Sequence, residues 1–309
     1  MILEQSHADL WSTVHASQVR AVVQAPVETD NKYRRGVVLL ATGSHTYPGA
    51  AVLTAQAACR TGAGMVRYLG PNAVAQGVLA VRPEVVHGSG TYHCLVIGSG
   101  IPDAREDERS MLLQDSVDAG IPAVVDAGAL CLIEPGMPGL VITPHARELS
   151  VLLKRLGLAN WSEDDIASSR GGAAQAASEL LGCTVLLKGR HTYIAQGEYR
   201  ATVRTPNSWL ATAGTGDVLA GVLGTLIASQ IGHGIDMDAT QLSRTTAAAA
   251  WLHARAGWLA SQHNAGVAVA PNNVHAPSTM LDHGPLGGPV LASDVAQALP
   301  GVVAAVLAK

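Results

Sequence analysis

Short runs of β-branched and apolar residues alternate along this chain with longer segments rich in alanine and leucine, and this alternation strongly constrains the fold. The short runs are apolar at consecutive positions, which is typical of parallel strands covered on both faces. The longer segments carry apolar residues three and four positions apart and end in glycine, as helices that connect parallel strands do. We therefore predict an α/β fold with a mostly parallel central sheet and helices on both faces.

The expected strands share this continuous apolar character and lie at residues 36–42, 64–70, 94–98, 122–128, 140–143 and 183–189. Residues 191–204 differ, because Gly197 separates two runs of alternating polarity. This pattern predicts a hairpin that adds an antiparallel edge to the sheet. Residues 264–289 are rich in proline and have no repeating apolar pattern, so they predict a flexible loop.

Length and composition restrict the organisation and the partners of the chain. With 309 residues, of which 48% are hydrophobic, it can bury a large core, and we predict a single domain over 1–309 with an N-terminal extension at 1–30. The net charge of −4 includes no block of like charges, so neither nucleic acid nor a membrane is an expected partner. The four scattered cysteines are typical of reduced thiols, and no segment is predicted to span a membrane, which indicates a cytoplasmic protein.

The expected strands run into small or polar residues, in the stretches TGSHTYPGA, IGSG, DAGAL, TPHARE and KGRHT. Open α/β sheets bind ligands at the carboxyl ends of their strands, although glycine-rich turns also occur there for structural reasons alone. IGSG is not a dinucleotide-binding fingerprint, because Asp103 stands where the third glycine is required. The coincidence of these stretches predicts a ligand site at this edge of the sheet.

The stretch AGTGD, residues 213–217, carries the strongest functional signal. Gly214 and Gly216 allow the backbone to approach a ligand, and the helix expected near Asp217 directs its free N–H groups at the same place, which favours phosphate. An apolar stripe fixes this helix on the sheet through Val218, Leu219, Val222, Leu223, Leu226 and Ile227. Asp217 could be a general base that takes a proton, or it could only stabilise the positive end of the helix.

Five stretches of the chain carry a resemblance to a known family: ATAGTGDVLAGVLGTLIA, TPHARE, VVDAGAL, VLLKG and TGSHTYPGAAVLTAQAACRTGAG. Together they resemble the ADP/ATP-dependent NAD(P)H-hydrate dehydratase family of ribokinase-like proteins. The similarity covers about residues 31–230 and returns at 291–300. It implies a ribokinase-like three-layer α/β/α fold. It also implies repair of NADHX and NADPHX, the hydrated forms of NADH and NADPH. Since about thirty residues precede the first expected strand, we expect the stand-alone form without the epimerase domain that many relatives carry.

The resemblance assigns roles residue by residue. Ala50, Gly100 and His145 match positions that contact the hydrate, and Asp217 matches the residue that meets the substrate and acts as the base. The family's nucleotide-binding positions are matched by Lys188, Gly189, Arg190, His191, Thr192 and Gly216. Gly214 is added to this nucleotide-binding set because of the glycine pattern in AGTGD. Glu148 stands where ribokinase-like proteins use an acid to organise Mg²⁺ and water near the phosphates, with a surface carboxylate as the alternative.

Three stretches depart from the common family pattern. The chain reads GSGIP for G-P-G-x-G, DAGA for D-A-D-A, and it has Arg147 in place of the glycine of T-P-H-x-G-E. We interpret Arg147 as a solvated residue at a helix start, with a phosphate contact as the alternative. The histidines His7, His15, His233, His253 and His263 are interpreted as structural or surface residues.

The resemblance implies the cofactors and partners as well. Mg²⁺ and a nucleotide co-substrate, ADP in preference to ATP, are expected, with NADHX or NADPHX as substrate. A homotetramer is expected, and a separate epimerase is expected to supply the usable epimer. Two alternatives remain: a ribokinase-like small-molecule kinase of the hydroxyethylthiazole or pyridoxal type, and a catalytically silent nucleotide-binding regulator.

Overall fold

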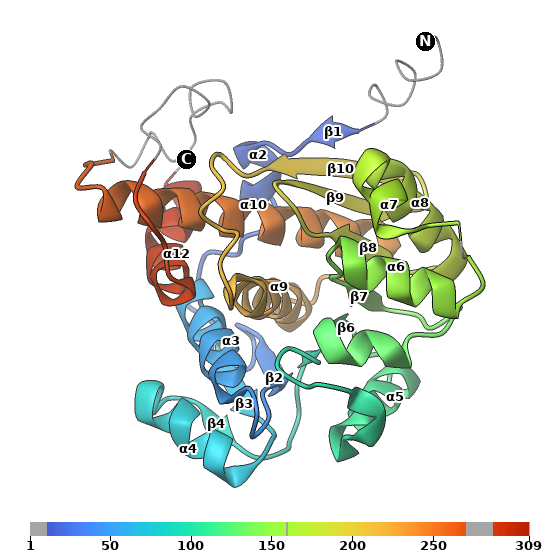
Figure 1. Ribbon diagram of the computed structural model, residues 1–309. Helices are drawn as coiled ribbons and strands as arrows, with labels where there is room; N and C mark the ends of the chain where they lie inside the picture. The colour runs from blue at the N-terminus through green and yellow to red at the C-terminus, as the bar shows by residue number, and fades with distance from the viewer. Residues whose placement is uncertain (1–10, 159, 270–286, 309) are drawn as a thin grey trace.

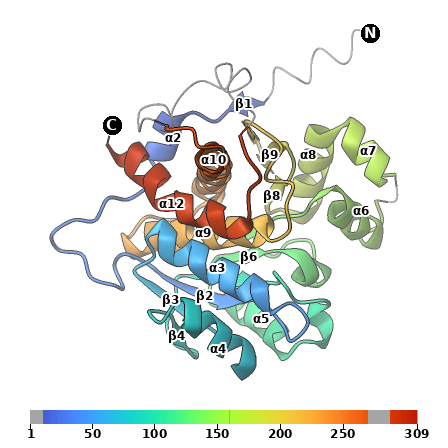
Figure 2. The same ribbon diagram turned by 60° about the vertical axis from the view of Figure 1, so that its left-hand side comes forward.

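A central sheet with helices on both faces gives the protein three layers (Figure 1, Figure 2). The structure is a computed structural model that describes residues 11–158, 160–269 and 287–308. Within these ranges the sheet has ten strands in the order β1-β10-β9-β8-β7-β6-β5-β2-β3-β4. Their bounds are β1 Ser12–Thr13, β2 Val37–Ala41, β3 Met65–Tyr68, β4 Val86–His87, β5 Cys94–Ile97, β6 Ala123–Val125, β7 Leu140–Ile142, β8 Thr184–Leu187, β9 His191–Gln196 and β10 Tyr199–Arg204.

The sheet is parallel except around the hairpin of β9 and β10, where both β8 with β9 and β9 with β10 pair antiparallel. Gly197 lies in the turn of this hairpin with a φ of 55°. The predicted fold class is therefore confirmed. The hairpin does not form the outermost edge, however, because β1 of the N-terminal extension pairs parallel with β10. The short β1 covers the hydrogen-bonding edge that β10 would otherwise expose.

Alternating strand residues enter two separate cores, which explains why the strands are apolar throughout. On β2, Val38 and Leu40 point to one face, and Leu39 and Ala41 to the other. The first face is covered by α2 Ala16–Arg20, α3 Pro48–Thr61, α4 Asn72–Val81, α9 Thr215–Gly232, α10 Ala239–Asn264 and α12 Ala292–Leu307. The second is covered by α5 Met111–Asp118, α6 Ala146–Arg155, α7 Glu163–Ser168 and α8 Arg170–Leu181.

Helix α9 lies in the middle of the first face and contacts β2, β5, β6, α3 and α10 (Figure 1). Its length and composition would allow it to cross a membrane, but 72% of it is buried inside the fold. Close packing accounts for two of its glycines: a Cβ at Gly221 would lie 2.4 Å from the carbonyl oxygen of Thr54, and one at Gly224 would lie 2.2 Å from the Val96 side chain. This packing holds the start of α9 at a fixed place beside the strand ends.

The remaining sequence predictions concern a loop, the cysteines and the domain organisation. Most of the loop predicted at 264–289 lies outside the described residues, and so does His7; α10 extends as far as Asn264. All four cysteines are free; Cys94 and Cys183 are buried, and Cys59 and Cys131 are half-buried. The single-domain organisation stays a prediction.

Candidate active site

Asp217 is the third residue of α9 and does not cap the helix. The capping position is held by Gly214, whose backbone is left-handed with a φ of 88°, and no side-chain hydrogen bond caps this end. A Cβ at Gly214 would approach the Leu53 side chain to 2.5 Å, so a larger residue here would require that side chain to shift. The start of α9 therefore leaves backbone N–H groups for a ligand.

The Asp217 carboxyl has an unusually high proton affinity for an aspartate. Burial is the largest cause, and the negative charge of Asp126 adds to it; together they raise the pKa of Asp217 to about 7. Lys188 and the Ser99 hydroxyl act in the opposite direction and are outweighed. A carboxyl with a pKa near neutrality can accept a proton as a general base and release it again.

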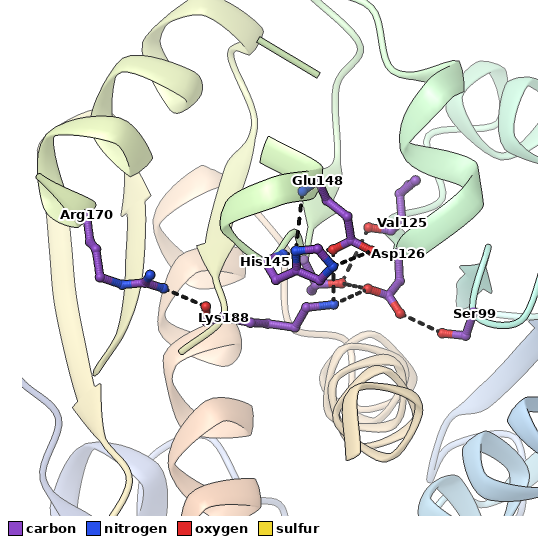
Figure 3. Close-up of polar contacts among 8 residues, drawn as sticks. Ser99, Val125, Asp126, His145, Glu148, Arg170 and Lys188 are labelled. Carbon is purple, nitrogen blue, oxygen red and sulfur yellow. Dashed lines mark hydrogen bonds and ion pairs between the residues drawn. The ribbon is translucent and has the colours of Figure 1, made fainter. Parts of the chain in front are cut away.

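Asp126 and Lys188 form a buried ion pair at the strand ends (Figure 3). The Lys188 Nζ donates to Asp126 Oδ1 at 2.7 Å, and the hydroxyls of Thr143 and Ser99 each donate to this carboxylate at 2.8 Å. Burial alone would raise the pKa of Asp126, but Lys188 and the two hydroxyls hold it below its ordinary value. The two charges thus stabilise each other, and the carboxylate of Asp126 stays ionised beside Asp217.

His145 and Glu148 form the capped start of α6 next to this pair (Figure 3). Glu148 Oε2 accepts a hydrogen bond from the His145 backbone at 2.8 Å, and the Glu148 backbone donates to His145 Nδ1 at 3.3 Å. The same carboxylate lies 3.6 Å from Lys188 Nζ. Glu148 is therefore more than a solvated surface residue, since it caps α6 and adds a second negative charge beside Lys188.

A cavity of about 600 Å³ opens next to these residues. Four of the five residues expected from KGRHT line it, namely Lys188, Gly189, Arg190 and Thr192, together with Gly216 and His145. His191 and Gly214 are not among its lining residues. Much of the remaining wall comes from residues 205–213, the loop between β10 and α9. This cavity has the size of a ligand pocket and meets the open start of α9.

Ala50 and Gly100, both expected to contact substrate, lie against each other. Gly100 has a φ of 70°, and a Cβ there would lie 2.4 Å from the Cβ of Ala50. This contact brings the start of α3 against the loop that follows β5. Ser99 of the same loop reaches Asp126, so the predicted substrate contacts lie next to the ion pair.

Two residues of the site escaped sequence reasoning. Asp126 stands in VVDAGAL, a stretch that marked a strand end and carried part of the family resemblance, but its partner Lys188 lies 62 positions away. His253 of α10 lines the cavity, although its position resembles that of any buried helix residue. Burial lowers the pKa of His253 to about 4, so the ring is neutral at physiological pH, and its Nε2 finds no hydrogen-bond partner within the described ranges. Among the other histidines, His15 caps α2 and His233 lies 3.3 Å from Asp30.

The described part of the chain holds no group of three or more His, Cys, Asp or Glu side chains that could enclose a metal ion. A protein-only metal centre is therefore not formed by these residues. Mg²⁺ bound to phosphates needs only one or two carboxylates, since phosphate oxygens and water complete its coordination. Glu148, which lies at the edge of the site with its side chain 23% exposed, fits that limited role.

The three-layer architecture, with a cavity at the strand ends, is a ribokinase-like fold. The fold is shared with a ribokinase-like superfamily protein from Enterococcus faecalis V583, with a TM-score of 0.74, 19% identity and coverage of 97% of this chain and 98% of the other. An ADP/ATP-dependent NAD(P)H-hydrate dehydratase from Bacillus subtilis, co-crystallised with ATP/Mg²⁺, has the same TM-score at 24% identity, covering 94% and 97% of the two chains.

The model of the NAD(P)H-hydrate dehydratase family matches residues 38–278, and this chain belongs to that family. A bifunctional NAD(P)H-hydrate repair enzyme, Nnr, from Mycobacterium tuberculosis is 37% identical over 245 residues, which are 75% of this chain and 49% of the relative. The chain thus spans about half the length of the first such relatives. An ADP-dependent (S)-NAD(P)H-hydrate dehydratase from Neisseria meningitidis is 29% identical over 268 residues, 80% of this chain and 84% of that one.

Proposed function

We propose that this protein is an ADP-dependent dehydratase that converts (6S)-NADHX and NADPHX back to NADH and NADPH, with AMP and phosphate as the other products. The observation that carries the proposal is the Asp217 carboxyl, whose pKa of about 7 and place in the uncapped start of α9 put a base beside a nucleotide-sized cavity. Family membership supports the choice of substrate. The named activity of the Neisseria relative supports the ADP-dependent reaction.

The proposed reaction begins with the hydroxyl that the hydrated nicotinamide ring carries next to its nitrogen. Asp217 takes the proton of this hydroxyl while its oxygen attacks the terminal phosphoryl group of ADP, and AMP leaves as the old P–O bond breaks. The lone pair of the ring nitrogen then expels phosphate, which is a better leaving group than hydroxide. Loss of a proton from the neighbouring ring carbon restores the dihydropyridine.

The other residues of the site bind and orient the reactants in this proposal. Lys188, Gly189, Arg190, Thr192 and Gly216 hold the nucleotide in the cavity that they line, with the free N–H groups of α9 directed at its phosphates. Ala50, Gly100 and His145 hold the hydrated ring. His191 and Gly214, each of which stands between two lining residues, belong to the same nucleotide-binding set in this proposal.

Glu148 would hold Mg²⁺ indirectly, through phosphate oxygens or water, and the ion would neutralise developing charge on the phosphoryl group. Co-crystallisation of the Bacillus dehydratase with ATP/Mg²⁺ supports this cofactor. We also propose a cytoplasmic homotetramer that receives the usable epimer from a separate epimerase. Relatives named as bifunctional repair enzymes support the coupling to a second activity.

The kinase alternative, of the hydroxyethylthiazole or pyridoxal type, has weaker support, because the family model that matches is that of the dehydratases. A kinase would use the same base and phosphate site but would release the phosphorylated alcohol as product. A silent regulator would bind nucleotide without turning it over, and the raised pKa of Asp217 gives no reason for such a role.

The deciding experiment incubates the protein with NADHX, Mg²⁺ and either ADP or ATP, and follows the absorbance of NADH. We expect absorbance to return in stoichiometric amount with AMP and phosphate, and faster with ADP than with ATP. A flat trace with both nucleotides overturns the dehydratase. Equal rates, or a faster rate with ATP, overturn only the preference for ADP.

A further inference from the structure

A second cavity, of about 530 Å³, lies between α6 and the η3 segment, Ala127–Leu132, and meets the nucleotide cavity at His145. Its wall comes from α6, from η3 and from Pro102, Asp103 and Arg105 in the loop that begins at Ser99 and Gly100. The loop that carries two residues of the active site therefore continues into this cavity. Any ligand that fills it reaches His145, which also lines the first cavity.

The cavity wall has three arginines and two carboxylates, Asp103 and Glu148. Arg105 is held by Asp103 at 2.5 Å, and Arg155 is held by Glu134. Glu148 caps α6 and lies near Lys188. Arg147 alone among these arginines has no hydrogen bond or ion pair with any residue of the described ranges, and its side chain is exposed. Within the described part of the chain, Arg147 is thus the one cation of this cavity wall without an ion-pair partner.

Arg147 stands at an unfavourable place for helix stability. It is in the first turn of α6, where the positive end of the helix dipole repels a cation. The family pattern commonly has glycine here. An arginine that costs stability and has no partner within the described part of the protein is well suited to bind an anionic group of a ligand.

The rest of the wall suits a nucleoside. Leu130 and Leu152 form a buried apolar floor, and the Val151 side chain is 65% exposed at the rim. An apolar surface beside a free cation is complementary to a base and ribose that carry a phosphate.

We propose that this second cavity binds the half of the dinucleotide substrate that is remote from the nicotinamide ring, with Arg147 contacting one of its phosphates. The inference rests on the proposed function, since that reaction requires two ligands at Asp217. The nucleotide fills the first cavity, and the ring of the hydrate lies at Ala50, Gly100 and His145. The remaining half of the dinucleotide then continues past His145 into the second cavity, where Arg147 lies.

The test measures the Kd of NADPH, of NADH and of ADP by calorimetry on the parent, on Arg147→Gln and on a matched control, Lys154→Gln. Lys154 is an exposed cation of the same helix that does not line the cavity. We expect Arg147→Gln to weaken NADPH binding about tenfold, as loss of a charge-assisted phosphate contact would, and to leave the Kd of ADP unchanged. Lys154→Gln should change none of the three. Val151→Trp, which fills the cavity from its exposed rim, should weaken NADPH binding as well.

Comparing NADPH with NADH shows which phosphate Arg147 contacts, because only NADPH carries a 2′-phosphate. Equal losses for NADPH and NADH assign Arg147 to the pyrophosphate, whereas a loss confined to NADPH assigns it to the 2′-phosphate. Unchanged binding of both in Arg147→Gln, or an equal loss for ADP, overturns the proposal. Binding and dehydration are measured separately. A parent that binds NADPH through Arg147 without dehydrating NADHX overturns the function alone, and active enzyme with unaltered dinucleotide binding in the variant overturns the cavity alone.

Discussion

Glu148 and Asp217 are both the third residue of a helix, α6 and α9, and both are near Lys188, but the two helix starts differ in chemistry. At α6, His145 and Glu148 satisfy each other's backbone groups. At α9, a glycine takes the capping position, no side chain closes the end, and burial beside Asp126 raises the pKa of Asp217 to about 7. The comparison shows that an acid in the first turn stabilises its helix where it can reach the backbone, and that its pKa rises where it is buried instead.

The largest expected effect comes from Asp217→Asn, which keeps the shape of the side chain but removes its proton affinity. Turnover of NADHX should fall by about 10² or more, the usual contribution of a general base. The affinity for ADP should be unchanged or slightly tighter, since a negative charge beside the phosphates is removed. Dehydration assays and calorimetry on one preparation measure both.

The stability of Asp217→Asn provides the control. Because the folded state raises the pKa of Asp217, ionisation of this group lowers the free energy of unfolding as pH rises from about 4 towards 7. The amide cannot ionise, so at pH 8 the variant should be at least as stable as the parent in a denaturant titration. Near-parental dehydration by a well-folded variant would end the case for Asp217 as the base.

The second largest effect is expected in the pH dependence of kcat/KM, at about tenfold per pH unit. A base works in its deprotonated form, so kcat/KM should fall about tenfold per unit below a midpoint near pH 7 and level off above it. Asp126→Asn should move this midpoint to lower pH, since it removes a negative charge near Asp217 and releases Lys188 from its pair.

Thr143→Val is the matched control for that profile, because it removes a hydrogen bond to Asp126 without removing the charge. Its midpoint should stay closer to that of the parent than the midpoint of Asp126→Asn. A profile that is flat from pH 6 to pH 8 in the parent would contradict the assignment of Asp217.

The smallest effect is expected at Glu148. Glu148→Ala should lower the free energy of unfolding by about 1 kcal/mol, the usual worth of a helix cap, whereas Glu148→Gln can keep the reciprocal hydrogen bonds and should stay close to the parent. If Glu148 also organises Mg²⁺, then Glu148→Gln should need several-fold more Mg²⁺ for half-maximal activity. A stable Glu148→Gln protein with an unaltered requirement for Mg²⁺ would leave Glu148 only its role as a cap.

The sequence predicted the fold well because its strongest signals are local. Continuous apolar runs predicted the parallel strands, and Gly197 between two runs of alternating polarity predicted the hairpin. The edge of the sheet was predicted wrongly, because β1 is only two residues long and carries no pattern. Its place is decided by pairing with β10, almost two hundred positions further along the chain.

For the candidate site, the sequence by itself determined the pieces whose chemistry lies in neighbouring residues: the glycines before Asp217, the helix that they begin, and most of the stretch from Lys188 to Thr192 that lines the cavity. Only the tertiary structure decided that Asp126 pairs with Lys188 and that His253 lines the cavity beside the start of α9. The physical reason is that a pKa depends on burial and on charges brought close by strand order, and neither can be read from positions far apart along the chain.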